Sequence, residues 1–513
     1  MKRSKILVPL VILVALSLSG IFDHELWTPD EPRDAEIGRE MRESGSWAVP
    51  TLNRQPHLEK PPLYFWSVAS AYAVFGVHAW SARLPSVLFA WGTLLFTFLI
   101  ARQMFGQRVA LQACLILVTM ALFLDVTHKS TVDNALLFFF TGTLFWLYAA
   151  FESELKLWLY LLAYAFALGT FMSKGLVGVG LAGTAFLAFL FWIRKPREII
   201  RAHPWFAVLI VGVGAMAWLA TLTPELRKVF LVDNQIWRFT GKNYSGGHIH
   251  PFYYYGPAIF YAFAPWILAF IPAIPWAFKR DGDVAPKRFL LVWVLVGLIL
   301  LSLASTKREI YLLPLCPAIA ILVSAWFERV PARPRWADVF LVIFASIILL
   351  GYLAVWAAAI YIRNWSGLAI AVGLAGAAAY WIRGQSWPQA LAVGSASLAL
   401  GAIFVLFPYL DEIKSLAPFC RGLPVIDPIP AYLPDETTQA IVPFYTGQYV
   451  RVIKDYAEAR QQASIRKPAY IVVVRKRRSE TVIEDLKSWY PYVWAGRESK
   501  DGRTMVLLVN MPK

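Results

Sequence analysis

Long apolar runs separated by short polar stretches fill most of the chain. A run of roughly 20 apolar residues is long enough to cross a bilayer core as a helix. The pattern predicts about thirteen spans, at 6–22, 82–101, 109–127, 134–151, 157–172, 176–193, 206–222, 252–277, 289–304, 311–327, 338–360, 365–382 and 389–409. The apolar segment 62–76 is shorter, and we interpret it as a re-entrant or interface-lying helix.

Basic residues recur on one side of the predicted spans. Lys2 and Arg3 precede the first span, which we interpret as a retained helix rather than a signal peptide. The basic stretches 194–201 and 279–288 then fall on the same side, as the positive-inside rule expects for the cytoplasm. This orientation puts the long loop 23–81 on the outer face.

The pattern changes after residue 409. Three apolar runs are typical of short strands: "AIVPFY" (440–445), "AYIVVV" (469–474) and "TMVLLVN" (504–510). The stretch "ETVIEDLKSWY" (480–490) has the pattern of an amphipathic helix. We therefore predict a membrane domain at 1–409 and a small soluble α/β domain at 410–513, on the same outer face as the first loop.

Composition agrees with a polytopic membrane protein. Hydrophobic residues make up 58% of the 513 residues and charged residues only 16%, against about 25% charged in soluble domains. The net charge of +16 is distributed between apolar spans rather than on one face. Nucleic acid is therefore not an expected partner.

Carboxylates gather in "WTPDEPRDAEIGRE" (27–40), just after the first span. Residues 34–43 fit an ordinary amphipathic helix with Glu/Arg pairs at helical spacing. Asp30 and Glu31 fit that interpretation less well, because they lie between Pro29 and Pro32 at the start of the helix. A carboxylate there can cap the helix or take part in a site, and the pattern leaves both open.

Two further motifs place charge beside an apolar helix. In "HLEKPPLYFW" (57–66), Glu59 and Lys60 precede a pair of prolines. They are either a solvated Glu with a snorkelling Lys, or part of a metal or phosphate site. In "THKSTVDN" (127–134), Asp133 opens a span and is either an N-cap or a group facing a polar cavity.

Basic residues at outer span ends depart from the positive-inside pattern. Lys174 lies in "FMSKG", and Lys307 and Arg308 lie in "STKREIY". An anionic lipid phosphate would account for them. The outer loop that follows the seventh span adds Arg238 and His248; His-x-His can bind a metal, although histidines in aqueous loops are more often solvated.

Several of these motifs resemble one family. "WTPDEPRDAEIGREM", "LEKPPLYFW", "MSKG" and "STKREIYLLPLCPAIAIL" are similar to the GT-C class of membrane glycosyltransferases. They resemble in particular the bacterial branch related to protein O-mannosyltransferases and to the aminoarabinose transferase that modifies lipid A. The resemblance covers roughly residues 20–330 and is strongest around 27–62. It implies a mainly α, polytopic GT-C fold in the bacterial inner membrane.

The resemblance also implies roles for the candidate residues. Asp30 corresponds to the acid that acts as base or positions the acceptor, and Asp133 to the second acid of the site. Glu59 corresponds to the acid near a divalent metal ion, with His248 as a loop histidine near that metal. The catalytic candidates are therefore Asp30, Glu31 and Asp133; the metal candidates are Glu59 and His248; and the candidates for the donor phosphate are Lys60, Arg238, Lys174, Lys307 and Arg308.

The implied reaction moves a sugar from a polyprenyl phosphate to a hydroxyl or phosphate on a glycolipid, protein or polysaccharide, at the periplasmic face and with inversion. Cations stabilise the departing phosphate, and a carboxylate takes the proton of the acceptor. The alternative is a lipid-linked sugar transporter or flippase, which predicts ionisable residues in mid-span. The sequence instead concentrates them on the outer face.

Overall fold

Helices dominate the computed structural model, which describes residues 4–153, 157–242, 248–280, 284–329, 335–382, 387–465, 469–475, 486–498 and 504–510. In these ranges eight helices are long and apolar enough to cross a membrane, or up to ten if each of two bent pairs is one span. The predicted polytopic helical fold is confirmed, while the count of thirteen spans stays a prediction.

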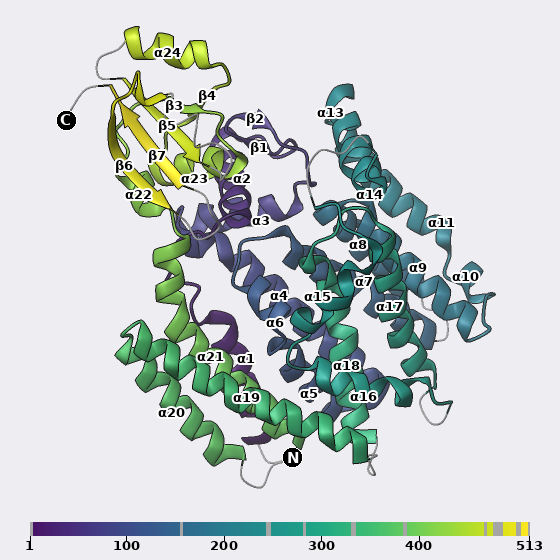
Figure 1. The fold of residues 1–513 in the computed structure, drawn as a ribbon. Helices are drawn as coiled ribbons and strands as arrows, with labels where there is room; N and C mark the ends of the chain where they lie inside the picture. The colour runs from purple at the N-terminus through teal and green to yellow at the C-terminus, as the bar shows by residue number, and fades with distance from the viewer. Residues whose placement is uncertain are drawn as a thin grey trace.

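Figure 1 shows the course of the chain from the purple N-terminus to the yellow C-terminal domain. The outer-loop elements are α2 (Asp30–Ser44), β1 (Thr51–Leu52), β2 (Gln55–Pro56) and α3 (Leu63–Phe75). The helices of the membrane domain are α1 (Ser4–Leu18), α4 (Ala79–Phe105), α5 (Gln107–Val118), α6 (Ala121–Thr127), α7 (Val132–Glu152), α8 (Leu157–Lys174), α9 (Leu176–Trp192), α10 (Glu198–Arg201), α11 (Pro204–Ala207), η1 (Val208–Gly212), α12 (Val213–Ala220), α13 (Pro224–Lys228), η2 (Val229–Trp237), α14 (Arg238–Thr240), η3 (Phe252–Tyr254), α15 (Tyr255–Ala262), α16 (Ile267–Phe278), α17 (Val284–Leu303), η4 (Glu309–Leu315), α18 (Cys316–Arg329), α19 (Arg335–Tyr361), α20 (Trp365–Ile382) and α21 (Trp387–Lys414).

Small residues let the central helices pack closely. A Cβ added to Gly142 of α7 would come within 2.3 Å of the Phe166 ring on α8. Gly92 of α4 accommodates Phe138 of α7 in the same way. Packing of this kind stabilises helix pairs in lipid, where water cannot drive them together. Helices α4, α7 and α8 therefore form a closely packed group, against which α3 of the first loop packs.

Helix α2 is a polar helix that is nearly all buried. Asp30 and Glu31 lie in its first turn, where carboxylates interact favourably with the helix dipole, and Gly45 ends it in the left-handed conformation. Residues 31–41 are buried, because α3 packs on one side and the C-terminal domain on another. The helix indicated by the Glu/Arg spacing of residues 34–43 is confirmed, and most of it is buried.

The C-terminal domain is a five-stranded sheet with helices on both faces (Figure 1). Its elements are α22 (Ala417–Arg421), β3 (Ile429–Tyr432), α23 (Glu436–Thr446), β4 (Val450–Ile453), α24 (Tyr456–Ile465), β5 (Tyr470–Arg475), β6 (Tyr492–Glu498) and β7 (Thr504–Val509). The strand order is β4-β3-β5-β7-β6, with β3 parallel to β4 and β5 and the remaining pairs antiparallel.

The predicted strands at 469–474 and 504–510 correspond to β5 and β7, whereas the strand predicted at 440–445 is wrong. Those residues lie in α23. The Asp435 side chain caps the start of this helix by accepting a hydrogen bond from the Thr438 amide, and the helix ends at Gly447, whose backbone is left-handed. The two caps fix a helix despite the β-branched run. Much of the helix predicted at 480–490 lies outside the described residues.

The sheet docks directly on the first outer loop. The Asn53 side chain donates to the Val450 carbonyl at 2.8 Å and accepts from the Val450 amide at 2.9 Å. Helix α23 packs along α2, and Arg421 pairs with Glu25 at 2.5 Å. Helix α21 runs on to Lys414, past the predicted boundary at 409–410. The C-terminal domain therefore lies directly beside the start of helix α2.

Candidate active site

A polar cavity of about 360 Å³ opens where the ends of several membrane-domain helices meet the C-terminal domain. Its walls come from the start of α2, the segment before α3, the ends of α7 and α8 that face it, α14, the segment before η4 and the start of α23. The lining residues are Pro29, Asp30, Arg33, Glu59, Lys60, Asp133, Lys174, Arg238, His248, Arg308, Tyr311, Asp435, Glu436 and Thr437.

Asp30 lies in this cavity with its carboxylate held between two guanidinium groups. One oxygen pairs with Arg308, and the other is 3.3 Å from Arg33 Nη2. Burial works to raise the pKa of Asp30, but Arg308 and then Arg33 outweigh burial and hold that pKa well below its ordinary value. Asp30 is therefore an ionised carboxylate at neutral pH, and its side chain is still 25% exposed.

Arg33 connects four carboxylates around the cavity. Its guanidinium lies 3.3 Å from Glu436, 3.4 Å from Asp34 and 3.8 Å from Glu59, besides its contact with Asp30. Sequence reasoning did not select Arg33. Its position one helical turn after Asp30 was a signal for that pair, but the long-range partners left no trace in the local pattern.

Four more cations line the cavity: Lys60, Lys174, Arg238 and Arg308. Lys60 Nζ lies 3.6 Å from Asp34 Oδ1, and burial together with Arg33 lowers the pKa of Lys60. Arg238 lies 3.8 Å from Glu59 and donates to the Tyr311 hydroxyl at 3.2 Å. The Lys60–Asp34 and Arg238–Glu59 distances are long for ion pairs, so a phosphate group can compete for Lys60 and Arg238.

Lys174 is placed by a tight turn between two helices. Gly175 adopts a φ of +81° so that α8 turns directly into α9, and a Cβ there would meet Gln235 at 2.4 Å. Lys174 pairs with Asp133, in the first turn of α7, and lies 4.6 Å from the centre of the Tyr311 ring. The structure thus brings both predicted residues to the same wall.

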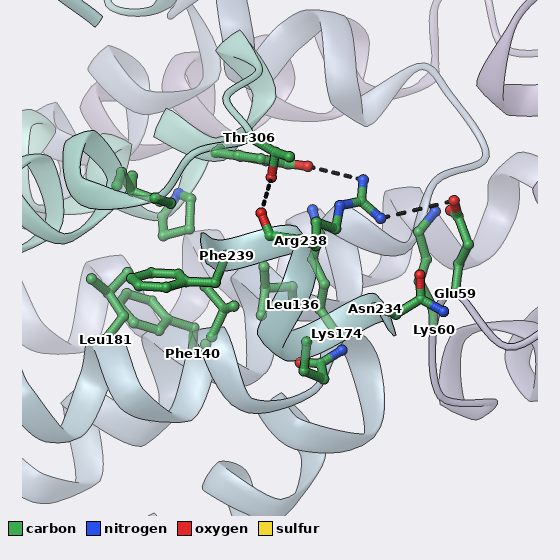
Figure 2. A pocket seen from close by; sticks show the side chains of 17 residues that line it. Glu59, Lys60, Leu136, Phe140, Lys174, Leu181, Asn234, Arg238, Phe239 and Thr306 are labelled. Carbon is green, nitrogen blue, oxygen red and sulfur yellow. Dashed lines mark hydrogen bonds and ion pairs between the residues drawn. The ribbon is translucent and has the colours of Figure 1, made fainter. Parts of the chain in front are cut away.

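An apolar groove leads into the cationic side of the polar cavity. Its walls are Leu136 and Phe140 of α7, Leu181 of α9, Phe239 of α14 and Leu301 of α17. Figure 2 shows Leu181, Phe140 and Phe239 toward one end of the groove and Lys60 and Glu59 at the other. A wider part of about 360 Å³ continues between α9 and α17. The groove is therefore amphipathic, because its apolar part ends at a group of cations.

Two predicted residues lie outside the polar cavity. Glu31 is 1% exposed and forms a buried pair with Arg83 at 2.6 Å, while also accepting from the Trp27 and Ser130 amides. Lys307 donates to the carbonyls of His250 and Ala304. Their geometry is that of residues that fix the loop backbone.

A possible metal-ligand group lies at the edge of the cavity. Among the described residues, His57, Glu59 and Glu436 each offer one ligand atom, all within 4.8 Å of one another. His248 lines the same cavity but does not belong to this group. Sequence reasoning missed His57, although its spacing from Glu59 in "HLE" is a usable signal, and it could not place Glu436 beside a loop so distant in sequence.

Similarity to known proteins agrees with this architecture. Residues 59–220 match the family described as dolichyl-phosphate-mannose-protein mannosyltransferase. The chain is 29% identical over 335 residues to the undecaprenyl phosphate-alpha-4-amino-4-deoxy-L-arabinose arabinosyl transferase 2 of Pseudomonas fluorescens, covering 63% of this chain and 56% of that protein. The corresponding transferase of Serratia proteamaculans is 30% identical over 60% of this chain and 57% of its own length. The chain thus spans about three fifths of the length of these curated relatives.

Solved structures share the fold. ArnT from Cupriavidus metallidurans bound to undecaprenyl phosphate superposes with a TM-score of 0.81 at 20% identity, covering 100% of this chain and 99% of that one. The archaeal oligosaccharyltransferase AglB from Archaeoglobus fulgidus, in complex with an inhibitory peptide and a dolichol-phosphate, gives 0.52 at 11% identity, covering 97% and 74%. The GT-C fold expected from the sequence motifs is confirmed.

The buried position of Glu31 leads to a prediction about stability. Glu31→Gln leaves Arg83 as a buried cation without its partner, and breaking such a pair lowers the free energy of unfolding by about 3 kcal/mol. Asp30→Asn, at the adjacent and partly exposed position, should change the thermal unfolding midpoint far less. Thermal unfolding of both variants in detergent measures the difference, and equal midpoints would contradict a bracing role for Glu31.

Proposed function

We propose that this chain, a GT-C membrane protein of the family that joins the protein mannosyltransferase-like and aminoarabinose transferase-like proteins, is a glycosyltransferase that uses a polyprenyl-phosphate sugar. The observation that carries the proposal is the apolar groove, which ends at Lys60, Lys174 and Arg238 beside Asp30. A polyprenyl chain fits the groove, and its phosphate fits the cations. The sugar then lies at the Asp30 side of the cavity.

The residues of the cavity divide between leaving group and acceptor. The bond between the anomeric carbon and the phosphate oxygen breaks, and Lys60, Lys174 and Arg238 stabilise the charge that appears on that oxygen. The acceptor oxygen bonds to the anomeric carbon from the opposite side, with inversion. Asp30, kept ionised by Arg308 and Arg33, accepts the hydrogen bond of the acceptor and takes its proton as the new bond forms.

The sugar and acceptor are inferred at the level of class. The curated relatives are named for the transfer of 4-amino-4-deoxy-L-arabinose from undecaprenyl phosphate, which favours a pentosyl over a hexosyl donor. The acceptor is a glycolipid of the lipid A kind, a protein or a polysaccharide. The flippase alternative gains no support from these relatives, which are named as transferases. The distribution of basic loops supports a periplasmic site in the bacterial inner membrane.

We also propose that a divalent metal ion binds His57, Glu59 and Glu436. Nitrogen and carboxylate ligands suit Mn²⁺ and Zn²⁺. Burial lowers the pKa of His57, which keeps its imidazole neutral and able to bind a metal. The ion would add positive charge next to the donor phosphate and join the C-terminal domain to the first outer loop. This ligand set has His57 and Glu436 beside Glu59, in place of the His248 predicted from the sequence.

Asp30→Asn should abolish sugar transfer while the protein still inserts and binds donor lipid. The amide cannot take the acceptor proton, whereas the groove and its cations are unchanged. Transfer is measured by mass spectrometry of membrane glycolipids and glycoproteins, and donor binding by titration with undecaprenyl phosphate. Normal turnover by this variant would remove Asp30 from the chemistry.

The affinity for undecaprenyl phosphate should fall as the pH rises from 7.5 to 10. Lys60 attracts phosphate only while it is protonated. Because its pKa is lowered from the ordinary lysine value of 10.5, it loses its charge at a lower pH than an ordinary lysine does. Lys60→Arg should preserve the affinity at pH 10 because a guanidinium stays charged, and Lys60→Ala should be weak throughout. The control is Lys195→Arg, at an exposed lysine outside the cavity. Identical pH profiles for wild type and Lys60→Arg would contradict a phosphate role for Lys60.

Mn²⁺ should raise the unfolding midpoint of the EDTA-treated protein. An ion at about 100 times its Kd adds about 2.7 kcal/mol to the free energy of unfolding. Glu436→Gln should lose this increment, and His248→Gln should keep it. The opposite result, with His248→Gln insensitive and Glu436→Gln responsive, would assign the ion to the pair predicted from the sequence.

A further inference from the structure

Basic residues gather at the end of α9 and α17 that lies away from the groove. Helix α9 begins beside the groove at Leu176 and ends at Trp192, whereas α17 begins at Val284 and reaches the groove at Leu301. The two helices pack against each other, and the 17 residues of α9 span about 25 Å. The segments after α9 and before α17 therefore lie at the same far end of this pair. Their basic residues are Arg194, Lys195, Arg197 and Arg201 in the first segment, and Lys279, Arg280, Lys287 and Arg288 in the second.

Trp192 joins the two segments. Arg288 Nη1 donates to the Trp192 carbonyl at 3.4 Å, and the Arg288 guanidinium lies 5.8 Å from the centre of the Trp192 ring. The centre of the Phe278 ring, at the end of α16, lies 6.1 Å from the same point. The ends of α9 and α16 and the start of α17 therefore form one surface. We call it the basic–aromatic surface and define it by Trp192, Arg194, Phe278, Lys279, Arg280 and Arg288.

Three cations of the basic–aromatic surface are available to a ligand. Arg194, Lys279 and Arg280 are exposed, and their side chains have no ion pair or hydrogen bond among the residues that the structure describes. The local charge is positive as well: 194–201 has four basic residues and one acidic residue, and 279–288 has four and two. An excess of this kind attracts an anion, and the guanidinium fork suits the oxygens of a phosphate.

Exposed apolar side chains continue from the basic–aromatic surface along both helices. On α9, Phe191 and Leu187 are exposed and lie one helical turn apart. On α17, Leu295 follows Arg288 by two turns on the same face, Ile299 follows one turn later, and both are exposed. The helix ends are thus cationic and the adjoining helix faces are apolar. A phospholipid has both parts, whereas a soluble phosphate compound would use only the charges.

Solvation of basic loops in the cytoplasm does not account for this arrangement. The positive-inside rule requires only that basic residues remain on one side of the membrane, and it gives no reason for two segments to meet at one tryptophan. Arg102, exposed in the last turn of α4, represents the ordinary case. Tryptophan is typical of the depth at which lipid phosphates lie, and basic sites between helices on the cytoplasmic side bind acidic head groups.

We propose that the basic–aromatic surface binds the phosphate of an anionic phospholipid of the surrounding bilayer, whose acyl chains lie along α9 and α17. The bound lipid joins the segment after α9 to the segment before α17. It thereby stabilises the packing of two helices that also form the wider part of the groove. The proposal goes beyond sugar transfer, because no residue of this surface lines the polar cavity or the groove.

Native mass spectrometry of the full-length protein in dodecyl maltoside, titrated with lipid, tests the proposal. Dioleoyl phosphatidylglycerol should bind roughly tenfold more tightly than dioleoyl phosphatidylcholine, whose choline group is repelled by the arginines. sn-Glycerol 3-phosphate, which has the phosphate but no acyl chains, should not displace phosphatidylglycerol. Equal affinities for the two lipids would overturn the proposal, and displacement by glycerol phosphate would overturn a lipid as the source of the phosphate.

Charge variants locate the bound lipid. Arg194→Gln/Arg280→Gln removes one cation from each segment and should weaken phosphatidylglycerol binding roughly thirtyfold, since each basic residue near the head group contributes roughly fivefold. Arg194→Lys/Arg280→Lys keeps both charges and should stay within about threefold of wild type. Arg102→Gln, and Arg238→Gln in the groove, should stay within about twofold.

The controls separate this surface from general charge and from the groove. An equal loss in Arg102→Gln would reduce the effect to overall surface charge, and a loss in Arg238→Gln alone would place the lipid in the groove; either result would overturn the proposal. Phosphatidylglycerol should raise the thermal unfolding midpoint of wild type and of the lysine pair, but not of the glutamine pair. If the glutamine pair does not fold, Arg194→Gln and Arg280→Gln are measured singly, and each should weaken binding roughly fivefold.

Discussion

The guanidinium of Arg33 is the contact on which the arrangement of the polar cavity depends. It joins Asp30 of its own helix to Glu59 of the first loop and Glu436 of the C-terminal domain. The Asp30 and Glu59 side chains are 25% and 24% exposed, so leaving either without a cation would be costly, whereas Glu436 is 55% exposed. Because one guanidinium contacts all three, the position of Arg33 depends on the first loop and the C-terminal domain as well as on its own helix. The first outer loop and the C-terminal domain thus act as one unit although they are far apart in sequence.

Burial and pairing also set the protonation states that the proposed chemistry needs. In Glu59 burial opposes ionisation, but Arg33 and Lys60 lower its pKa to about 2. Asp30 is likewise held ionised, by Arg308 and Arg33. The pKa of Lys60 is also lowered, by burial and by the same Arg33, so its ammonium group loses its proton more easily. One dense cluster therefore keeps Asp30 and Glu59 charged and makes the proton of Lys60 easier to lose.

Periodicity and short motifs predicted much of this molecule, but only its local part. The apolar runs, the charged loop and residues such as Lys60 and Asp133 were readable because each signal lies within a few neighbouring positions. The strand expected at 440–445 failed because the caps at Asp435 and Gly447 decide that segment, while its interior favours a strand. Arg33 and Glu436 were missed for a different reason: their meeting depends on how the sheet docks, which no local pattern records.

Arg308 and Arg33 hold Asp30 from two sides, and this bears on the role proposed for its carboxylate. Arg308 pairs with the oxygen that Arg33 does not contact, so cations engage both oxygens in the structure. Both arginines line the polar cavity together with Lys60, Lys174 and Arg238. In the proposed reaction, an acceptor hydroxyl that donates a hydrogen bond to Asp30 therefore has to compete with one of these two guanidinium groups.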